Sequence, residues 1–156
     1  MEQSDIRLLP PGLYALDDLT PGDRIETGSA IVSAEVIDAF ADFSGDDFEI
    51  HLDRNAAVRH GFSDRVAHGL LVLALVDGLK CRASARIHAQ ASLGWHWSFK
   101  RPVLAQDTIR AQITVAEKRS LSDQKRGLLT LDVVVTNQNN DVVQSGTNTL
   151  MCYRSI

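Results

Sequence analysis

The chain has 156 residues, which is within the usual size of one domain. Lysine and arginine total 16 and aspartate and glutamate total 20, and the resulting charge of −4 argues against a nucleic-acid-binding surface. The two cysteines do not suggest a disulfide scaffold, and the sequence has no signal core and no apolar run near the ~20 residues that span a bilayer. We therefore expect a cytoplasmic protein that binds neither nucleic acid nor membrane.

The first part of the chain predicts an arm, a strand and a helix. Proline and glycine punctuate residues 1–22, which are expected to form an irregular arm ahead of one domain at 23–156. A short first strand is expected at 23–30. Ser33 is typical of a helix N-cap, and Gly45 suits the end of that helix.

A segment rich in carboxylates follows this helix. Five acidic or imidazole side chains lie within eight positions: Asp46, Asp47, Glu49, His51 and Asp53. Asp46 and His51 are five positions apart, so they do not share a helix face and would converge only through a turn, for which Gly45 offers a place. A carboxylate and an imidazole can divide general acid and general base work. The other interpretations are a solvated loop and, less favoured because the diagnostic spacings are missing, a metal site.

Two helices are expected next. Asp53 is placed to cap a short helix that runs to Arg59 and is closed by Gly61. The apolar stretch 66–85 predicts a central helix, at about 68–84, with apolar residues around most of its circumference. Cys81 is then most simply a small buried side chain.

The start of the central helix is a second candidate site. Free amide groups at a helix N-terminus favour negative charge, and Gly69 would let a ligand carbonyl approach its N–H closely. Alternatively, Gly69 merely eases the turn into the helix.

From residue 93 onwards the hydrophobic period changes to two, which is typical of antiparallel strands with one buried face. The apolar sets are Leu93, Trp95, Trp97 and Phe99; Ile109, Ala111, Ile113 and Val115; and Leu129, Leu131, Val133 and Val135. A last, weaker strand runs from Val143 to Tyr153. We therefore predict an α+β fold in which an antiparallel meander curls around the central helix.

Two motifs resemble those of a known family. Phe43-Ser44-Gly45-Asp46-x4-His51-Leu52-Asp53, followed by Val66-Ala67-His68-Gly69-Leu70-Leu71, resembles the MaoC-like hot-dog hydratases, which include (R)-specific enoyl-CoA hydratases. The segment from Phe99 to Thr108 is also similar to that family, and the resemblance covers roughly residues 20–153.

The resemblance implies a fold, a reaction and an assembly. The fold is a hot dog, and Asp46 and His51 activate a water for syn addition to a trans-2-enoyl-CoA, giving a (R)-3-hydroxyacyl-CoA. Gly69 N–H is the oxyanion donor for the thioester carbonyl, and no metal or redox cofactor is needed. The partners are an acyl-CoA thioester and a second copy of the chain, in a homodimer or higher homo-oligomer. His68 and Phe48, in the two motifs, are expected to bind substrate. From the residues alone, Trp97 is a candidate for an acyl pocket, with core packing as the alternative. Lys100 and Arg101 are candidates to meet CoA phosphates, with a solvated strand end as the alternative.

One departure from the family pattern concerns the loop itself. The family usually has Asn-Pro where this chain has Phe48-Glu49. If Glu49 faced Asp46, its negative charge would raise the pKa of the Asp46 carboxyl group. Two other functions remain open: a hot-dog acyl-CoA thioesterase, and a catalytically degenerate subunit that binds acyl-CoA.

Overall fold

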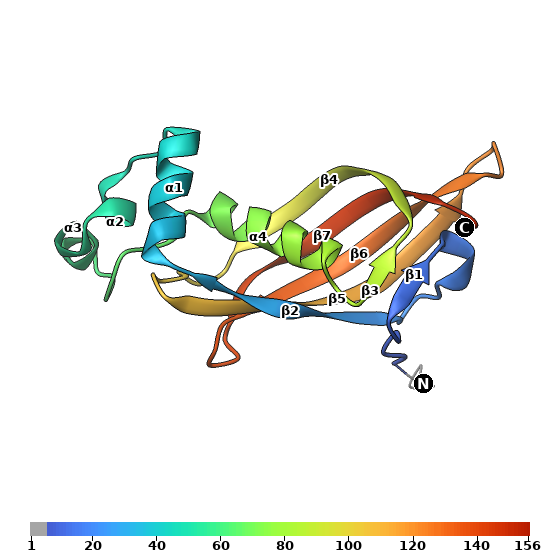
Figure 1. The fold of residues 1–156 in the computed structure, drawn as a ribbon, viewed down its shortest axis with the longest axis horizontal. Coiled ribbons are helices and arrows are strands. Elements are labelled where there is room, and N and C mark those ends of the chain that lie inside the picture. The colour runs from blue at the N-terminus through green and yellow to red at the C-terminus, as the bar shows by residue number, and fades with distance from the viewer. Residues whose placement is uncertain (1–5) are drawn as a thin grey trace.

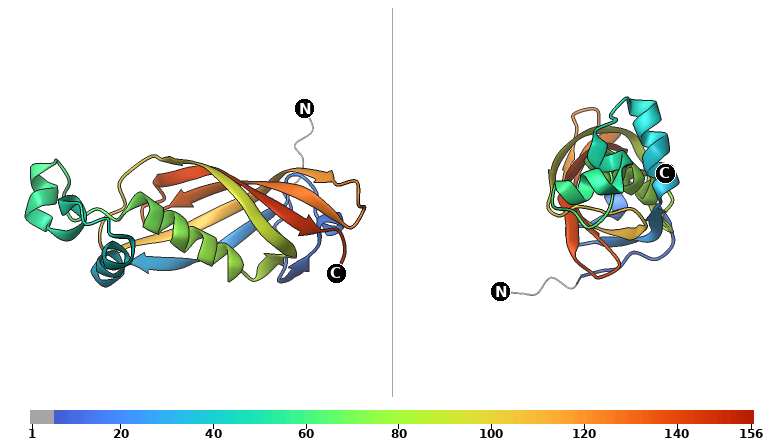
Figure 2. Two further views of the ribbon diagram at one scale, coloured as in Figure 1. Left: turned by 90° about the horizontal axis from the view of Figure 1, so that it is seen from above. Right: turned by 90° about the vertical axis from the view of Figure 1, so that its left-hand side faces the viewer.

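The computed structural model describes residues 6–156 and shows a five-stranded antiparallel sheet curved around one helix (Figures 1 and 2). The helix is α4, Gly69–Cys81, and the sheet order is β2-β5-β6-β7-β4. The strands are β2 Arg24–Val32, β4 Ala89–Phe99, β5 Asp107–Ser120, β6 Arg126–Thr136 and β7 Val142–Tyr153. The predicted sheet around a central helix is confirmed. The meander holds for β5, β6 and β7, whereas β4 pairs with β7 at the sheet edge and not with β5.

The core lies between α4 and the concave face of the sheet. The predicted alternation is confirmed in β5 and β6, where all eight apolar positions are buried. On α4 the buried side chains are Leu71, Val72, Val76 and Leu79. The helix is shorter than the predicted 68–84 because residues 82–84 form a turn that leads into a separate strand, β3 Ala85–Ile87. Its apolar circumference is also not fully covered, since Leu70 is 64% exposed, and Cys81 is exposed rather than buried.

Three short helices lie beyond one end of the sheet, next to the start of α4 (Figure 1). They are α1 Ala34–Ser44, α2 Glu49–Leu52 and α3 Arg54–Arg59. The predicted caps of α1 are confirmed: Ser33 Oγ accepts from Val36 N, and Gly45 adopts a left-handed φ of 78°. Asp53 caps α3 through the amide of Asn55, also as predicted. Helix α2, a single turn that carries His51, was not predicted from the sequence.

Two strands depart from the predicted pattern of buried faces. Leu93 and Phe99 of β4 are 54% and 57% exposed, because an edge strand is covered by fewer neighbours, while Trp95 and Trp97 are half-buried. In β7 the buried residues are 143, 144, 148, 150 and 152. Apart from Val143, they are the set opposite to the predicted alternation that runs from Val143 to Tyr153 in steps of two. Two polar members of the buried face, Gln144 and Asn148, hid this alternation from a reading of hydrophobicity.

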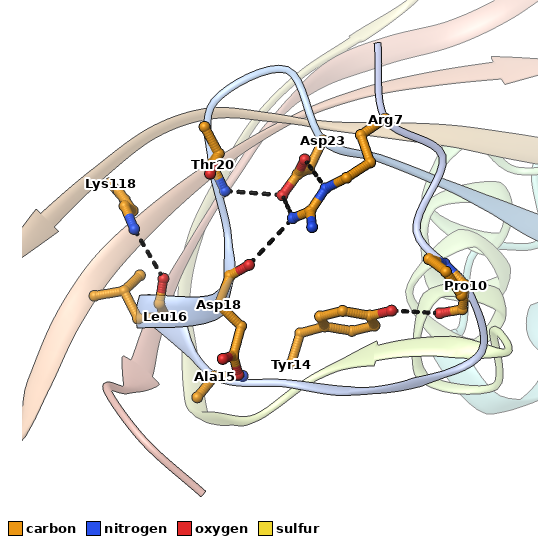
Figure 3. A network of polar contacts seen from close by, with 9 residues as sticks. All are labelled: Arg7, Pro10, Tyr14, Ala15, Leu16, Asp18, Thr20, Asp23 and Lys118. Atoms are coloured by element: carbon orange, nitrogen blue, oxygen red, sulfur yellow. Dashed lines mark hydrogen bonds and ion pairs between the residues drawn. The ribbon is translucent and has the colours of Figure 1, made fainter. Parts of the chain in front are cut away.

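The expected irregular arm is partly wrong. Residues 12–14 form strand β1, which pairs in parallel with β3, and Leu16–Asp18 form a 3-10 turn. Leu9, Leu16 and Leu19 are buried in the core. A polar network holds this segment (Figure 3), in which Arg7 Nε donates to Asp23 Oδ1 at 2.8 Å and Thr20 N donates to Asp23 Oδ2 at 2.8 Å. The Arg7 hydrogen bond is the main reason that the pKa of Asp23 lies below its ordinary value.

No helix within residues 6–156 combines the length and the apolar character needed to span a bilayer.

Candidate active site

Asp46 and His51 converge at the end of α1, through the turn that Gly45 begins. Asp46 N donates to Ser44 Oγ at 3.1 Å and Phe48 N donates to Asp46 Oδ1 at 3.4 Å, so the turn is closed by local hydrogen bonds. The helical turn of α2 then directs His51 back toward Asp46. His51 Nε2 and Asp46 Oδ2 are 4.0 Å apart.

The protonation state of the His51 ring follows from its other nitrogen. His51 Nδ1 lies 2.6 Å from the carbonyl oxygen of Val66, and a carbonyl only accepts hydrogen bonds, so Nδ1 carries the proton. In the neutral ring Nε2 therefore has a free lone pair. The ring is 8% exposed, and its burial is the largest cause that lowers the pKa of His51 below its ordinary value. His51 is thus a neutral base at pH 7.

The gap between the two groups is itself informative. A distance of 4.0 Å is too long for a direct hydrogen bond, yet it lets one water molecule contact both Nε2 and Oδ2. The arrangement can therefore hold a water between a base and a carboxylate.

Glu49 does not face Asp46. Its Oε1 lies 2.9 Å from His60 Nε2 and its Oε2 lies 3.7 Å from Arg59 Nη2, so both oxygens are directed toward α3. The expected repulsion between Glu49 and Asp46 is thereby avoided.

His68 lies behind His51 and is 2% exposed. Its ring stacks on that of His51, with centroids 3.8 Å apart, and its Nε2 is 2.8 Å from the backbone oxygen of Asp46. His68 therefore contacts both members of the candidate dyad, and its expected contact with a substrate stays a prediction.

Gly69 opens α4 and lines a cleft of about 330 Å³ that it shares with His51, Phe99, Lys100 and Arg101. Its amide belongs to the first turn, where backbone N–H groups have no acceptor within the helix. A Cβ at this position would lie 2.3 Å from the Phe99 ring, so any larger residue here would have to displace that ring. Since the φ of Gly69 is not left-handed, the alternative role in easing a turn has no support from its conformation.

The remaining predicted residues divide between the cleft and its surroundings. Lys100 and Arg101 line the cleft, and Arg101 also pairs with Asp141 at 3.1 Å. Phe48 and Trp97 are outside the lining: Phe48 is 51% exposed and meets His51 edge-on, while Trp97 is half-buried.

Two contributors were missed from the sequence. Gln144, 2% exposed, donates to Gly69 O at 3.1 Å and accepts from Trp97 Nε1 at 2.8 Å, which ties the start of α4 to the sheet. Arg65 donates from Nε to His51 O at 2.6 Å. Gln144 gave no signal of its own, because β7 also carries Ser145, Thr147, Asn148 and Thr149.

Asp46, His51 and His68 also have ligand atoms within 4.8 Å of one another, a spacing that invites comparison with a metal site. A metal takes an imidazole lone pair in the plane of the ring at about 2.0–2.1 Å. The two rings are stacked, with planes only 23° apart, so their lone pairs do not converge on one point. The geometry does not fit a metal held by both histidines.

The fold and site were compared with known proteins. Residues 18–137 match the family described as MaoC like domain. Over 103 residues the chain is 33% identical to Protein MaoC of Klebsiella aerogenes, covering 65% of this chain and 30% of that protein. It is 30% identical over 104 residues to a 3-hydroxybutyryl-CoA dehydratase of Methylorubrum extorquens, covering 65% and 63%. The first two relatives are thus matched over less than two thirds of their length.

Two further proteins are similar to this chain over more of their own length. A (R)-specific enoyl-CoA hydratase of Aeromonas caviae is 32% identical over 103 residues, covering 65% of this chain and 74% of that protein. The crystal structure of a MaoC-like dehydratase from Rhodospirillum rubrum superposes with a TM-score of 0.82 at 27% identity, covering 92% of this chain and 99% of that one. The predicted hot-dog fold is confirmed by such neighbours.

Proposed function

The chain belongs to the MaoC-like family of hydratases and dehydratases that act on acyl-CoA, and we propose that it adds water reversibly to a trans-2-enoyl-CoA to give a (R)-3-hydroxyacyl-CoA. The observation that carries this proposal is the 4.0 Å gap between Asp46 Oδ2 and the unprotonated Nε2 of His51. The names of the relatives support the substrate class and the stereochemistry.

The proposed reaction follows the geometry. A water held between Asp46 and His51 loses a proton to His51 Nε2 while its oxygen bonds to C3 of the enoyl group. The electron pair of the double bond moves to the thioester oxygen, where the Gly69 N–H donates a hydrogen bond. The imidazolium then returns the proton to C2 from the same face, which makes the addition syn. Dehydration is the reverse.

The cleft supports a thioester substrate. His51 and Gly69 line the same cavity as Lys100, whose ammonium group can meet a CoA phosphate. Arg101 is placed similarly, although its pairing with Asp141 has to be exchanged for a phosphate.

The direct test uses purified protein and crotonyl-CoA, with branched and longer enoyl-CoAs beside it. We expect loss of the conjugated thioester absorbance, a product of R configuration by chiral analysis, and little turnover by Asp46→Asn. No turnover of any enoyl-CoA, or full turnover by Asp46→Asn, would contradict the proposal. Release of free CoA thiol from saturated acyl-CoAs would instead establish the thioesterase.

We also propose a homodimer that pairs two copies of β4. All residues of this edge strand except Trp95 and Trp97 are exposed, and an open strand edge is a template for pairing with another chain. Light scattering should then give twice the 17.1 kDa of one chain, and Leu93→Lys should weaken the association. A monomer at micromolar concentration would contradict this assembly.

The free thiols of Cys81 and Cys152 fit the predicted cytoplasmic location, which stays a prediction.

A further inference from the structure

His68 occupies an unusual position at the start of α4. It is the N-cap residue, yet its side chain makes no capping hydrogen bond within the described part of the chain. Nε2 lies 2.8 Å from the backbone oxygen of Asp46, an acceptor, so Nε2 carries the proton and donates it. In the neutral ring Nδ1 then has a lone pair, and it finds no partner among residues 6–156 although the side chain is 2% exposed.

A buried acceptor without a partner is unfavourable and usually reflects a role. Phenylalanine would fill this space without leaving such an atom. Compared with phenylalanine, histidine adds one polar contact here, the hydrogen bond that Nε2 donates to the backbone oxygen of Asp46.

The ring also contacts the second member of the dyad. It stacks on His51 with centroids 3.8 Å apart and planes at 23°, while Phe40 of α1 packs against it at 4.9 Å. His68 therefore touches His51 through its ring face, holds Asp46 through Nε2, and precedes Gly69 in the chain.

The Asp46 peptide depends on this contact. Its other described hydrogen bonds are local, to Ser44 and Phe48, and its side chain is 54% exposed. The bond from His68 is the one that joins this turn to α4, which starts 23 residues further along the chain at Gly69.

We propose that His68 is a positioning residue, which holds the Asp46 peptide and the His51 ring at the spacing that accommodates the reacting water. This rests on the proposed hydratase function. Reacting groups displaced by about 1 Å can lose up to about a hundredfold in rate, so loss of the His68 donor should reduce kcat and leave KM nearly unchanged.

The experiment compares three substitutions that separate the donor from the ring. Gln places an amide N–H near the position of Nε2, Asn places one near Nδ1, and Phe keeps an aromatic ring without a donor. We expect His68→Phe and His68→Asn to lower kcat on crotonyl-CoA at least tenfold, with KM within threefold of the wild-type value. His68→Gln should recover kcat to within about threefold of wild type because it restores the donor. His88→Phe is the matched control, since the His88 ring packs at a tilt against Tyr153 and is outside the cleft.

A second measurement uses the wild-type protein and does not depend on the folding of any variant. The ¹⁵N shifts of the imidazole nitrogens should show His68 protonated at Nε2 and His51 protonated at Nδ1. Protonation of His68 at Nδ1 alone would overturn the proposal.

The kinetic outcomes separate the two claims. Turnover by wild type with an unchanged kcat in a folded His68→Phe overturns the positioning role alone. A kcat of His68→Gln as low as that of His68→Phe also overturns it, because the donor would then be irrelevant. Absence of turnover by the wild type overturns the proposed function.

Discussion

The two ends of α4 both hold polar side chains, and they differ in whether those groups are paired. At the C-terminal end Lys80 Nζ donates to the buried Asn148 Oδ1 at 2.8 Å, lies 2.7 Å from Asp77 Oδ1, and sits 5.1 Å from the Trp95 ring centre. At the N-terminal end the lone pair of His51 Nε2, the exposed carboxylate of Asp46 and the first-turn amide of Gly69 keep hydrogen-bonding capacity for a ligand. Paired groups stabilise the fold, whereas groups with unused capacity can act on a substrate. Substitutions at the first end should thus change stability and those at the second end activity.

The largest effect is expected for His51→Gln. Without the imidazole base, kcat on crotonyl-CoA should fall by about 10²–10⁴-fold. His60→Gln is the matched control, because His60 is 44% exposed and pairs with Glu49 rather than with a reacting group. Its kcat should stay within twofold of wild type. Equal losses in both variants would remove the basis for assigning the chemistry to His51.

Gly69→Ala should lower kcat/KM by roughly tenfold, because the new methyl group displaces the Phe99 ring, which lines the cleft. Phe99→Ala creates space for that methyl group. The double substitution should therefore recover most of the loss, as measured in a double-mutant cycle. A double variant as impaired as Gly69→Ala would show that Phe99 is not the obstacle.

Lys80→Met tests the C-terminal end of α4, where a substitution should change stability and not activity. It leaves Asn148 Oδ1 buried without its donor, which should cost about 1–3 kcal/mol in the free energy of unfolding. Activity per folded molecule should remain within twofold of wild type.

Asp46→Asn should behave oppositely, with a stability change within about 0.5 kcal/mol at an exposed side chain and a large loss of activity. Chemical denaturation and initial rates measured on the same samples decide between these patterns.

The smallest expected effect is a change in kcat/KM with pH, set by the pKa of His51. Burial lowers the pKa of His51, so its basic form persists below pH 6.5, the ordinary value for histidine. The kcat/KM for hydration should stay level down to about pH 6.5 and fall at lower pH, as the base becomes protonated. A limb centred above pH 6.5 would contradict the burial argument.

Much of the fold was predictable because its signals are local. Ser33 and Gly45 fix the limits of α1 through capping and a left-handed φ, and the alternation in β5 and β6 reports one buried face. The exposure of β4 was not predictable, because an edge position depends on which strands pair. The burial of Gln144 and Asn148 was missed because polar residues obscure a hydrophobic period.

The site was predictable in its members but not in its geometry. The motifs single out Asp46, His51, His68 and Gly69, and the structure brings these four together. The pairing of Glu49 with His60 and the bond from His68 to Asp46 depend on how α2, α3 and α4 pack. No spacing in the sequence specifies such contacts.

The central claim is that Asp46 and His51 act as one unit on one water. It is tested most directly by kcat/KM on crotonyl-CoA for the wild type, Asp46→Asn, His51→Gln and the double variant. Residues that act as a unit are strongly non-additive, so the double variant should be within about threefold of the more impaired single variant. Losses that multiply in the double variant would show two independent contributions and would contradict the account.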